Sequence, residues 1–256
     1  MKSPKASRVK KAGHNTERFF AYLIGVKNKN IVTGTGKTDL FNKDGKRISL
    51  KSSHDKKGRS QICLYKYSSK YFKDTNNGST KRMQECLVVF PPTHGEYSAN
   101  KQAIKKLLQE KMIALQKYIN TNKANKREFL DFVFFTDHDN KKIDFLVVTD
   151  WDSNFYVFEA SEVLDIFCEH TKVENSKARH EYETTALKVI FKGMNEKGKY
   201  INLIENEIRT STHYRTFLSV GNKLKYLFVL LSNIKPQIKV KPGLILCGRA
   251  TKNFNF

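Results

Sequence analysis

The residues best suited to chemistry in this chain are a carboxylate at Asp39 and the short run Ser49-Leu50-Lys51. Between them lies Asp44-Gly45, and an Asp-Gly pair between two runs with apolar residues is a strong short-range signal for a β-hairpin. Side chains alternate between the faces of a strand, so Ser49 and Lys51 share the face opposite to Leu50. The hairpin is therefore expected to gather a carboxylate, a hydroxyl and an ammonium group.

Such a cluster suits metal-assisted hydrolysis of a phosphodiester. A carboxylate holds a divalent cation, while a nearby lysine orients or deprotonates water and offsets the charge that develops on the phosphoryl group. We expect Asp39 to bind the metal, with the backbone carbonyl of Leu50 as a second ligand. Lys51 would position or activate the water, and Ser49 would hold a metal-bound water.

The pattern resembles the PD-(D/E)XK nuclease superfamily, and type II restriction endonucleases in particular. That family carries an Asp and, after a spacer, (D/E)-x-K on the next strand. Asp39 matches the first position and Lys51 the last, whereas Ser49 stands where the family usually has an acid. Family members often add a Glu from the first helix, and Glu17 is the matching residue. The resemblance covers roughly residues 9–70.

The resemblance implies an α/β (α+β) fold with a central mixed β-sheet flanked by helices and with additional β-rich DNA-recognition elements. It implies Asp39, Ser49, Lys51 and Glu17 as catalytic residues, and Glu17 as a metal ligand acting through water. The implied cofactor is Mg²⁺, with Mn²⁺ as a substitute, and the implied substrate is double-stranded DNA. A structural role for Glu17 stays open, because the helix dipole favours an acid in the first turn of a helix expected at 15–24.

Two groups of residues are candidate DNA contacts. Basic and hydroxyl side chains surround the hairpin at Lys37, Ser52, Ser53, Lys56 and Arg59. A second run combines guanidinium, hydroxyl, imidazole and aromatic groups at Arg209, Thr210, His213, Tyr214 and Arg215. Arginine pairs with guanine and hydroxyls contact phosphates, so the second run is the better candidate for reading bases.

The sequence also contains two rival motifs, of which the first overlaps the hairpin segment. Residues 34–38, GTGKT, resemble the end of a phosphate-binding P-loop, but Ile31 occupies the position of its first glycine. A P-loop must also lead into a helix, whereas the residues after Asp39 read as strand and turn. The run Asp137-His138-Asp139-Asn140 could hold a metal, although Asp and Asn are ordinary turn residues.

The composition favours a folded protein with a polyanionic partner. The chain has 256 residues, 39% hydrophobic content and a formal charge of +22. Lysine enrichment from an AT-rich genome explains the choice of Lys over Arg, but it does not explain 47 basic against 25 acidic residues. A surplus of this size steers a protein toward nucleic acid.

Cysteine spacing and hydropathy bear on the compartment. Four cysteines without a C-x-x-C pair are typical of reduced, mostly buried thiols rather than of a zinc site. No segment reads as a signal peptide or a membrane span, so we expect a cytoplasmic protein.

The expected organisation is a basic arm at 1–12 and a single nuclease domain at 13–256. The catalytic core would occupy about 13–160 and a DNA-recognition part about 161–256. Helices are predicted at 15–24, 98–120 and 161–170. Besides the hairpin of 38–52, strands are predicted at 60–66, 84–90, 129–135, 143–149, 155–158, 186–192, 200–204 and 226–231.

The leading functional hypothesis is a type II restriction endonuclease paired with a cognate DNA methyltransferase, acting as a homodimer or as a monomer. A repair, recombination or mobile-element nuclease is an alternative with the same fold. A DNA-binding protein that no longer cleaves, with Ser49 replacing a lost acid, is an alternative of a different class.

Overall fold

The computed structural model describes residues 4–32, 36–52, 61–68, 77–149, 154–177, 186–210, 216–233, 235–236 and 238–240. Contacts divide the chain into two compact units made of interleaved segments. Unit 1 comprises Met1–Ile62, Phe135–Val163 and Lys223–Phe256, and unit 2 comprises Cys63–Phe134 and Leu164–Asn222. This differs from the expected division of one domain near residue 160, because the chain leaves unit 1 and returns to it twice.

Unit 1 contains a mixed β-sheet with the strand order β1-β2-β4-β5-β10. Its strands are β1 (Leu40–Phe41), β2 (Arg47–Lys51), β4 (Phe145–Thr149), β5 (Phe155–Glu159) and β10 (Ile238–Val240). β2 pairs with β4 in parallel, whereas β1–β2, β4–β5 and β5–β10 are antiparallel. The chain is thus α+β with a mixed sheet, as expected.

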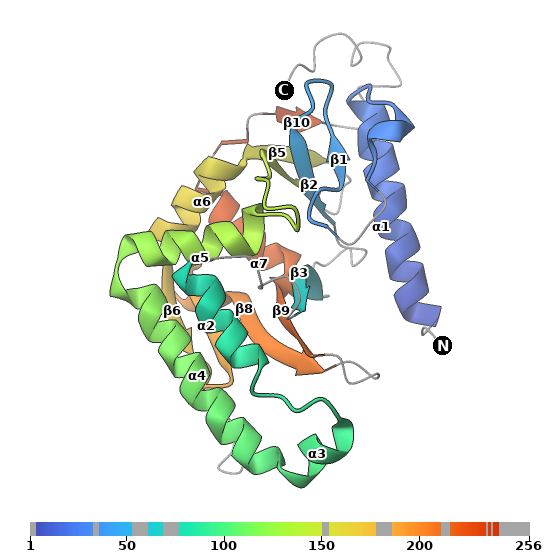
Figure 1. The fold of residues 1–256 in the computed structure, drawn as a ribbon. Coiled ribbons are helices and arrows are strands. Elements are labelled where there is room, and N and C mark those ends of the chain that lie inside the picture. The colour runs from blue at the N-terminus through green and yellow to red at the C-terminus, as the bar shows by residue number, and fades with distance from the viewer. Residues whose placement is uncertain are drawn as a thin grey trace. The chain divides into compact units, whose positions relative to one another are not determined.

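Helix α1 (Pro4–Leu23) covers one face of this sheet (Figure 1). Phe20, Leu23 and Ile24 recur at helical spacing and are buried against Ile48 and other apolar side chains of the sheet. Burying one such side chain contributes about 1.5–3 kcal/mol to folding. Because Ile48 and Leu50 face α1, the side chains of Ser49 and Lys51 project from the opposite face of the sheet.

Unit 2 contains a second sheet with the order β3-β9-β8-β7-β6. Its strands are β3 (Gln61–Ser68), β6 (Thr171–Asn175), β7 (Lys188–Met194), β8 (Tyr200–Thr210) and β9 (Thr216–Lys223). The helices placed beside it are α2 (Gly78–Leu87), α3 (His94–Ala99), α4 (Lys101–Thr121) and α5 (Lys123–Phe135). Strands β6 to β9 pair as antiparallel neighbours.

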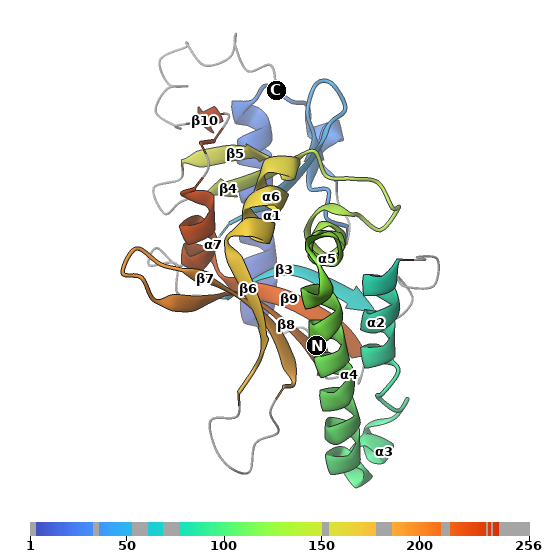
Figure 2. The ribbon, with the colours of Figure 1, turned by 90° about the vertical axis from the view of Figure 1, so that its left-hand side faces the viewer.

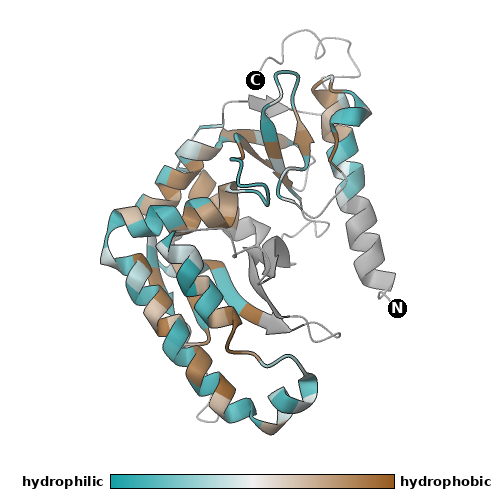
Figure 3. Cartoon of the chain, viewed as in Figure 1, coloured by the Kyte–Doolittle hydropathy of each residue, from teal (hydrophilic) through white to brown (hydrophobic). Residues whose placement is uncertain are grey.

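Helix α4 packs on β6 and β7 and supplies much of this core (Figure 2). Its buried side chains are Ile104, Leu108, Met112, Leu115 and Ile119. Brown and teal residues alternate along α4 at helical spacing in Figure 3, as expected for a helix with one apolar stripe. The predicted helix at 98–120 is confirmed, as are those at 15–24 and 161–170, the latter as α6 (Ala160–Glu169).

Three segments predicted as strands are helical. Residues 84–90 overlap α2, 129–135 form the end of α5, and 226–231 lie in α7 (Leu224–Leu231). Short apolar runs are compatible with either a buried strand or a buried helix, so periodicity alone does not decide between them. In α5 the preceding residues begin the helix, and the side chain of Asn122 accepts a hydrogen bond from Asn125 N at 2.8 Å.

Residues 4–12, which were expected to belong to a basic arm, are helical, because α1 begins at Pro4. Proline suits the first turn of a helix, and Ala, Lys and Arg favour its continuation. The helix expected at 15–24 therefore begins further toward the N-terminus than predicted. Glu17 consequently lies far from the first turn, and the helix dipole gives no reason for an acid there.

Other predicted elements agree with the structure or fall partly outside it. The strands at 60–66, 143–149, 155–158, 186–192 and 200–204 are confirmed as β3, β4, β5, β7 and β8. Strand β6 was not among the predicted strands. Of the described cysteines, Cys86 and Cys168 are buried free thiols. Among the described residues, none of the helices has the length and apolar character required to cross a bilayer.

Candidate functional site

The predicted hairpin is present, and its turn explains how it forms. The side-chain oxygen of Asn42 accepts hydrogen bonds from Asp44 N at 3.0 Å and Lys46 N at 2.8 Å. Gly45 has φ of 77°, a left-handed conformation that glycine adopts without strain. The turn fixes the register, in which Leu40 lies opposite Ile48. Asp39 is thereby placed next to the end of β2.

Asp39 is held through its backbone and its carboxylate. Its N–H donates to Ile48 O at 2.8 Å, and its carbonyl accepts from Val32 N at 2.9 Å. The carboxylate oxygen Oδ2 accepts from Leu50 N at 2.6 Å and from the Ser49 hydroxyl at 3.4 Å. Lys51 Nζ lies 3.9 Å from the same oxygen. The structure therefore brings together the carboxylate, hydroxyl and ammonium groups that the sequence predicted.

The electrostatics of Asp39 are unusual for an aspartate with a lysine beside it. Burial raises the pKa of this carboxyl from 3.8 to about 6, against the opposing effects of Lys51, Leu50 N–H and Ser49. The negative charge of Glu17 raises it further. The Asp39 side chain is 20% exposed, so water reaches the carboxylate. The ammonium of Lys51 does not fully compensate the negative charges of Asp39 and Glu17.

Glu17 reaches the neighbourhood of Asp39 from α1. Its negative charge is one of the causes that raise the pKa of the Asp39 carboxyl. Only 13% of its side chain is exposed, and Oε2 contacts His14 Nδ1 at 2.9 Å. The contact with His14 was not predicted, although the spacing of three residues within a helix is a signal for it.

The carbonyl of Leu50 faces the same side as Asp39. In a β-strand the N–H and C=O of one residue point to the same side, and Leu50 N–H donates to Asp39. The predicted second oxygen ligand therefore has a suitable direction. Among the described residues no group of three or more His, Cys, Asp or Glu side chains is arranged to hold a metal. A cation at this position would thus depend on two carboxylates and a backbone oxygen.

Asp137 anchors the segment that precedes Asp39, a contact across about a hundred residues of sequence. Its Oδ1 accepts from Lys37 N at 2.8 Å and from His138 N at 2.7 Å. Its Oδ2 accepts from Thr38 N at 2.8 Å and from the Thr38 hydroxyl at 2.5 Å. A β-carbon added to Gly36 would come within 2.9 Å of Asp137, so only glycine permits this approach. We call this arrangement the Asp137 clamp.

The clamp affects the pKa of Asp137, and Arg47 extends its hydrogen-bond network. Burial alone would raise the pKa of Asp137, but hydrogen bonds from Thr38, Lys37 and His138 outweigh it and lower the pKa. Arg47 extends the network from β2, donating to both oxygens of Asp139 at 3.1 and 2.6 Å. The carboxylates of Asp137 and Asp139 therefore hold the turn and the hairpin through hydrogen bonds. This favours a structural turn over a metal site for the run 137–140.

The P-loop alternative does not fit this geometry. The backbone N–H groups of Lys37 and Thr38, which a P-loop would offer to phosphate, bind Asp137 instead. The chain then continues into β1 and not into a helix. Lys37 is 2% exposed and its ammonium donates to Thr136 O at 2.6 Å. Its side chain is thus not available to DNA in this structure, contrary to the prediction.

The other predicted DNA contacts are only partly described. Ser52 is half-buried directly after β2. Arg209 and Thr210 form the end of β8, where Thr210 pairs with Thr216 of β9, so the predicted recognition run connects these two strands. The remaining candidates lie outside the described residues: Ser53, Lys56, Arg59, His213, Tyr214 and Arg215.

Comparisons with protein-family models, with curated proteins and with solved structures found no match to this chain. The functional argument therefore depends on the geometry of the site itself. Sequence reasoning missed Asp137 as a partner of the hairpin and Arg47 as its second connection. Gly36 was the available signal, because a glycine before a structured segment can indicate close approach by another group.

Proposed function

We propose that this protein is a magnesium-dependent nuclease that hydrolyses phosphodiester bonds of double-stranded DNA, with Asp39 and Lys51 at its active site. The observation that supports this most is the contact of 3.9 Å between the Lys51 ammonium and a carboxylate whose pKa burial raises to about 6. A buried, incompletely compensated carboxylate beside a lysine suits catalysis better than stability.

The residues present fit a magnesium ion. Mg²⁺ prefers oxygen ligands and uses only one or two carboxylates, with water completing its shell. Asp39 and the Leu50 carbonyl would hold the ion, and Glu17 would contribute through water. When bound, the ion would supply charge to stabilise the phosphoryl oxygens. The departure at Ser49 fits this set, since its hydroxyl contacts Asp39 at 3.4 Å and supports the carboxylate without adding charge.

Lys51, Ser49 and the Leu50 N–H group supply the other functions of the active site. Lys51 is 17% exposed, so its ammonium is accessible to a water molecule or a phosphate oxygen while it remains paired with Asp39. It orients the attacking water and offsets negative charge on the phosphoryl group. Ser49 and Leu50 N–H fix the Asp39 carboxylate in one orientation. Fixing these groups in advance lowers the barrier because they need not reorganise during the reaction.

The charge of +22 favours a nucleic acid as the substrate. Within this class we favour a type II restriction endonuclease, because the Asp39–Lys51 hairpin resembles that family's motif. A repair, recombination or mobile-element nuclease would use the same active site. A protein that binds DNA without cleaving it would retain the positive charge but make no use of Lys51.

Digestion of unmethylated phage DNA with purified protein and Mg²⁺ tests this proposal. Lys51→Ala removes the ammonium, and Lys46→Ala is the matched control, since Lys46 lies on the same hairpin and pairs with Asp144 at the surface. We expect discrete fragments from the wild type and from Lys46→Ala, and none from Lys51→Ala. A smear that depends on Lys51 would favour the repair-type alternative.

Absence of cleavage by the wild type with either Mg²⁺ or Mn²⁺, despite tight DNA binding, would favour the binding-only alternative. Cleavage that survives Lys51→Ala would overturn the assignment of the active site.

A further inference from the structure

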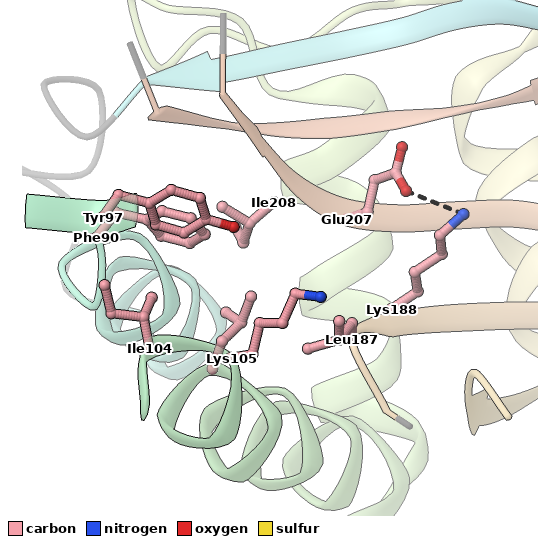
Figure 4. Close-up of a pocket in the computed structure, with 9 residues that line it drawn as sticks. Phe90, Tyr97, Ile104, Lys105, Leu187, Lys188, Glu207 and Ile208 are labelled. Carbon is pink, nitrogen blue, oxygen red and sulfur yellow. Dashed lines mark ion pairs between the residues drawn. The ribbon is translucent and has the colours of Figure 1, made fainter. Parts of the chain in front are cut away.

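Unit 2 contains a pocket of about 210 Å³ that the proposed cleavage site does not use. It opens between the α3–α4 region and the strands β7 and β8 (Figure 4). Ile104 of α4 and Ile208 of β8 supply apolar walls. Tyr97 closes one side and is stacked on Phe90, with ring centroids 5.6 Å apart. Drug-sized ligands occupy about 300–1,000 Å³, so this pocket suits a smaller group of one or two rings.

One cationic group gives the pocket its charge. The Lys105 ammonium extends toward the side formed by β7 and β8, and it has no ion-pair partner among the described residues (Figure 4). Glu207 of β8 also lines the pocket, but its carboxylate is directed away from Lys105 and pairs with Lys188 of β7 at 2.9 Å (Figure 4). The pocket therefore offers a cation at the edge of an apolar space.

We propose that this pocket binds a single nucleotide, with its base between the apolar walls and its phosphate near Lys105. Aromatic side chains stack on bases, which gives Tyr97 a role. An ammonium attracts phosphate, which gives Lys105 a role. A nucleotide inside a duplex cannot reach such a pocket, so the base would have to rotate out of the helix.

The position of the pocket in the chain supports this ligand. Glu207 and Ile208 directly precede Arg209 and Thr210, the first residues of the predicted base-reading run, on the same strand. A nucleotide in this pocket would thus lie close to the start of that run. The inference rests on the proposed DNA substrate but not on the cleavage reaction.

Fluorescent 2-aminopurine provides three probes, used in EDTA so that no cleavage occurs. One is a duplex with 2-aminopurine opposite an abasic site, where the base leaves the helix easily. The second is the same duplex fully paired, and the third is free 2-aminopurine deoxyriboside 5′-monophosphate. The variants are Lys105→Ala and Tyr97→Ala. Lys106→Ala is the matched control, because Lys106 is an exposed neighbour on α4 that does not line the pocket.

We expect the wild type to bind the abasic-site duplex about tenfold more tightly than the paired duplex, the scale of one base–protein stacking contact. Lys106→Ala should keep this preference, and Lys105→Ala and Tyr97→Ala should lose most of it while retaining the wild-type circular dichroism spectrum. Binding of the free nucleotide alone, with the same dependence on Lys105 and Tyr97, would also support the pocket and would make a soluble nucleotide its source.

A wild-type preference that neither variant reduces, or no preference and no binding of the free nucleotide, would overturn the inference. If the protein nevertheless cleaves DNA in a parallel assay with Mg²⁺, only the pocket assignment fails. If none of the three probes binds, the proposed DNA substrate fails with it.

Discussion

At the scale of single residues, the proposed active site lowers the stability of the folded protein. Asp39 is largely buried and is affected by the charge of a second acid, Glu17, and its pKa of about 6 means that ionising it in the folded protein costs free energy. Leu50 N–H, Ser49 and Lys51 reduce this cost without removing it. A carboxylate kept under such conditions is explained by function more readily than by folding.

Replacing Asp39 by Asn should therefore stabilise the protein while abolishing cleavage. The folded-state pKa lies above the ordinary 3.8, so the contribution of Asp39 to stability is greatest below about pH 4 and is lost as the pH rises through about 6. At pH 8 the neutral amide avoids this loss, and we expect a gain of about 1–2 kcal/mol. Urea unfolding of both proteins at pH 8 and pH 4 measures it. A destabilised Asp39→Asn at pH 8 would contradict the account.

The same pKa predicts how metal binding depends on pH. Protons compete with the cation for Asp39, so Mn²⁺ affinity without DNA should rise as the pH increases through about 6. Electron paramagnetic resonance of free Mn²⁺, titrated with protein between pH 5 and pH 8, measures this. Glu17→Gln removes the neighbouring negative charge and should move the midpoint to lower pH. A pH-independent affinity would argue against Asp39 as a ligand.

At the scale of elements, local and long-range contacts differ in how well the sequence predicts them. The hairpin was predictable because Asn42 and Gly45 form its turn locally. Helix α7 and the end of α5 were not, since their apolar runs satisfy either periodicity and packing decides between them. The Asp137 clamp was also not predictable, because nothing in residues 36–38 indicates which distant carboxylate will bind them.

Removing the clamp should disturb Asp39 from a distance. Asp137→Asn replaces one of the two accepting oxygens by an amide NH2. Either the N–H groups of Lys37 and His138 or the two donors of Thr38 then lose their acceptor, and we expect a loss of about 2–4 kcal/mol in stability. Cleavage at saturating Mg²⁺ should persist at temperatures where the variant is folded, with a higher Mg²⁺ requirement. Asp139→Asn, in the same turn but 46% exposed, is the control. Equal effects of both substitutions on Mg²⁺ requirement and stability would rule out a specific role for the clamp.

At the scale of the whole molecule, the dominant property is charge. With 47 basic and 25 acidic residues, binding to DNA should release many counterions from the phosphates. Affinity for duplex DNA measured by fluorescence anisotropy should fall by about a hundredfold between about 50 and 200 mM salt. A much weaker dependence would show that the positive charge is not directed at nucleic acid.

The most direct test of the central claim is cleavage of supercoiled plasmid in Mg²⁺ with enzyme in excess, comparing the wild type with Asp39→Asn, Lys51→Ala and Lys46→Ala. Each variant is first shown to be folded by circular dichroism. The account predicts nicked or linear plasmid with the wild type and Lys46→Ala, and at least a thousandfold slower reaction, on the order of the loss of one essential electrostatic group, with Asp39→Asn and Lys51→Ala. Unchanged cleavage by either of these variants would contradict the assignment of the active site to this hairpin.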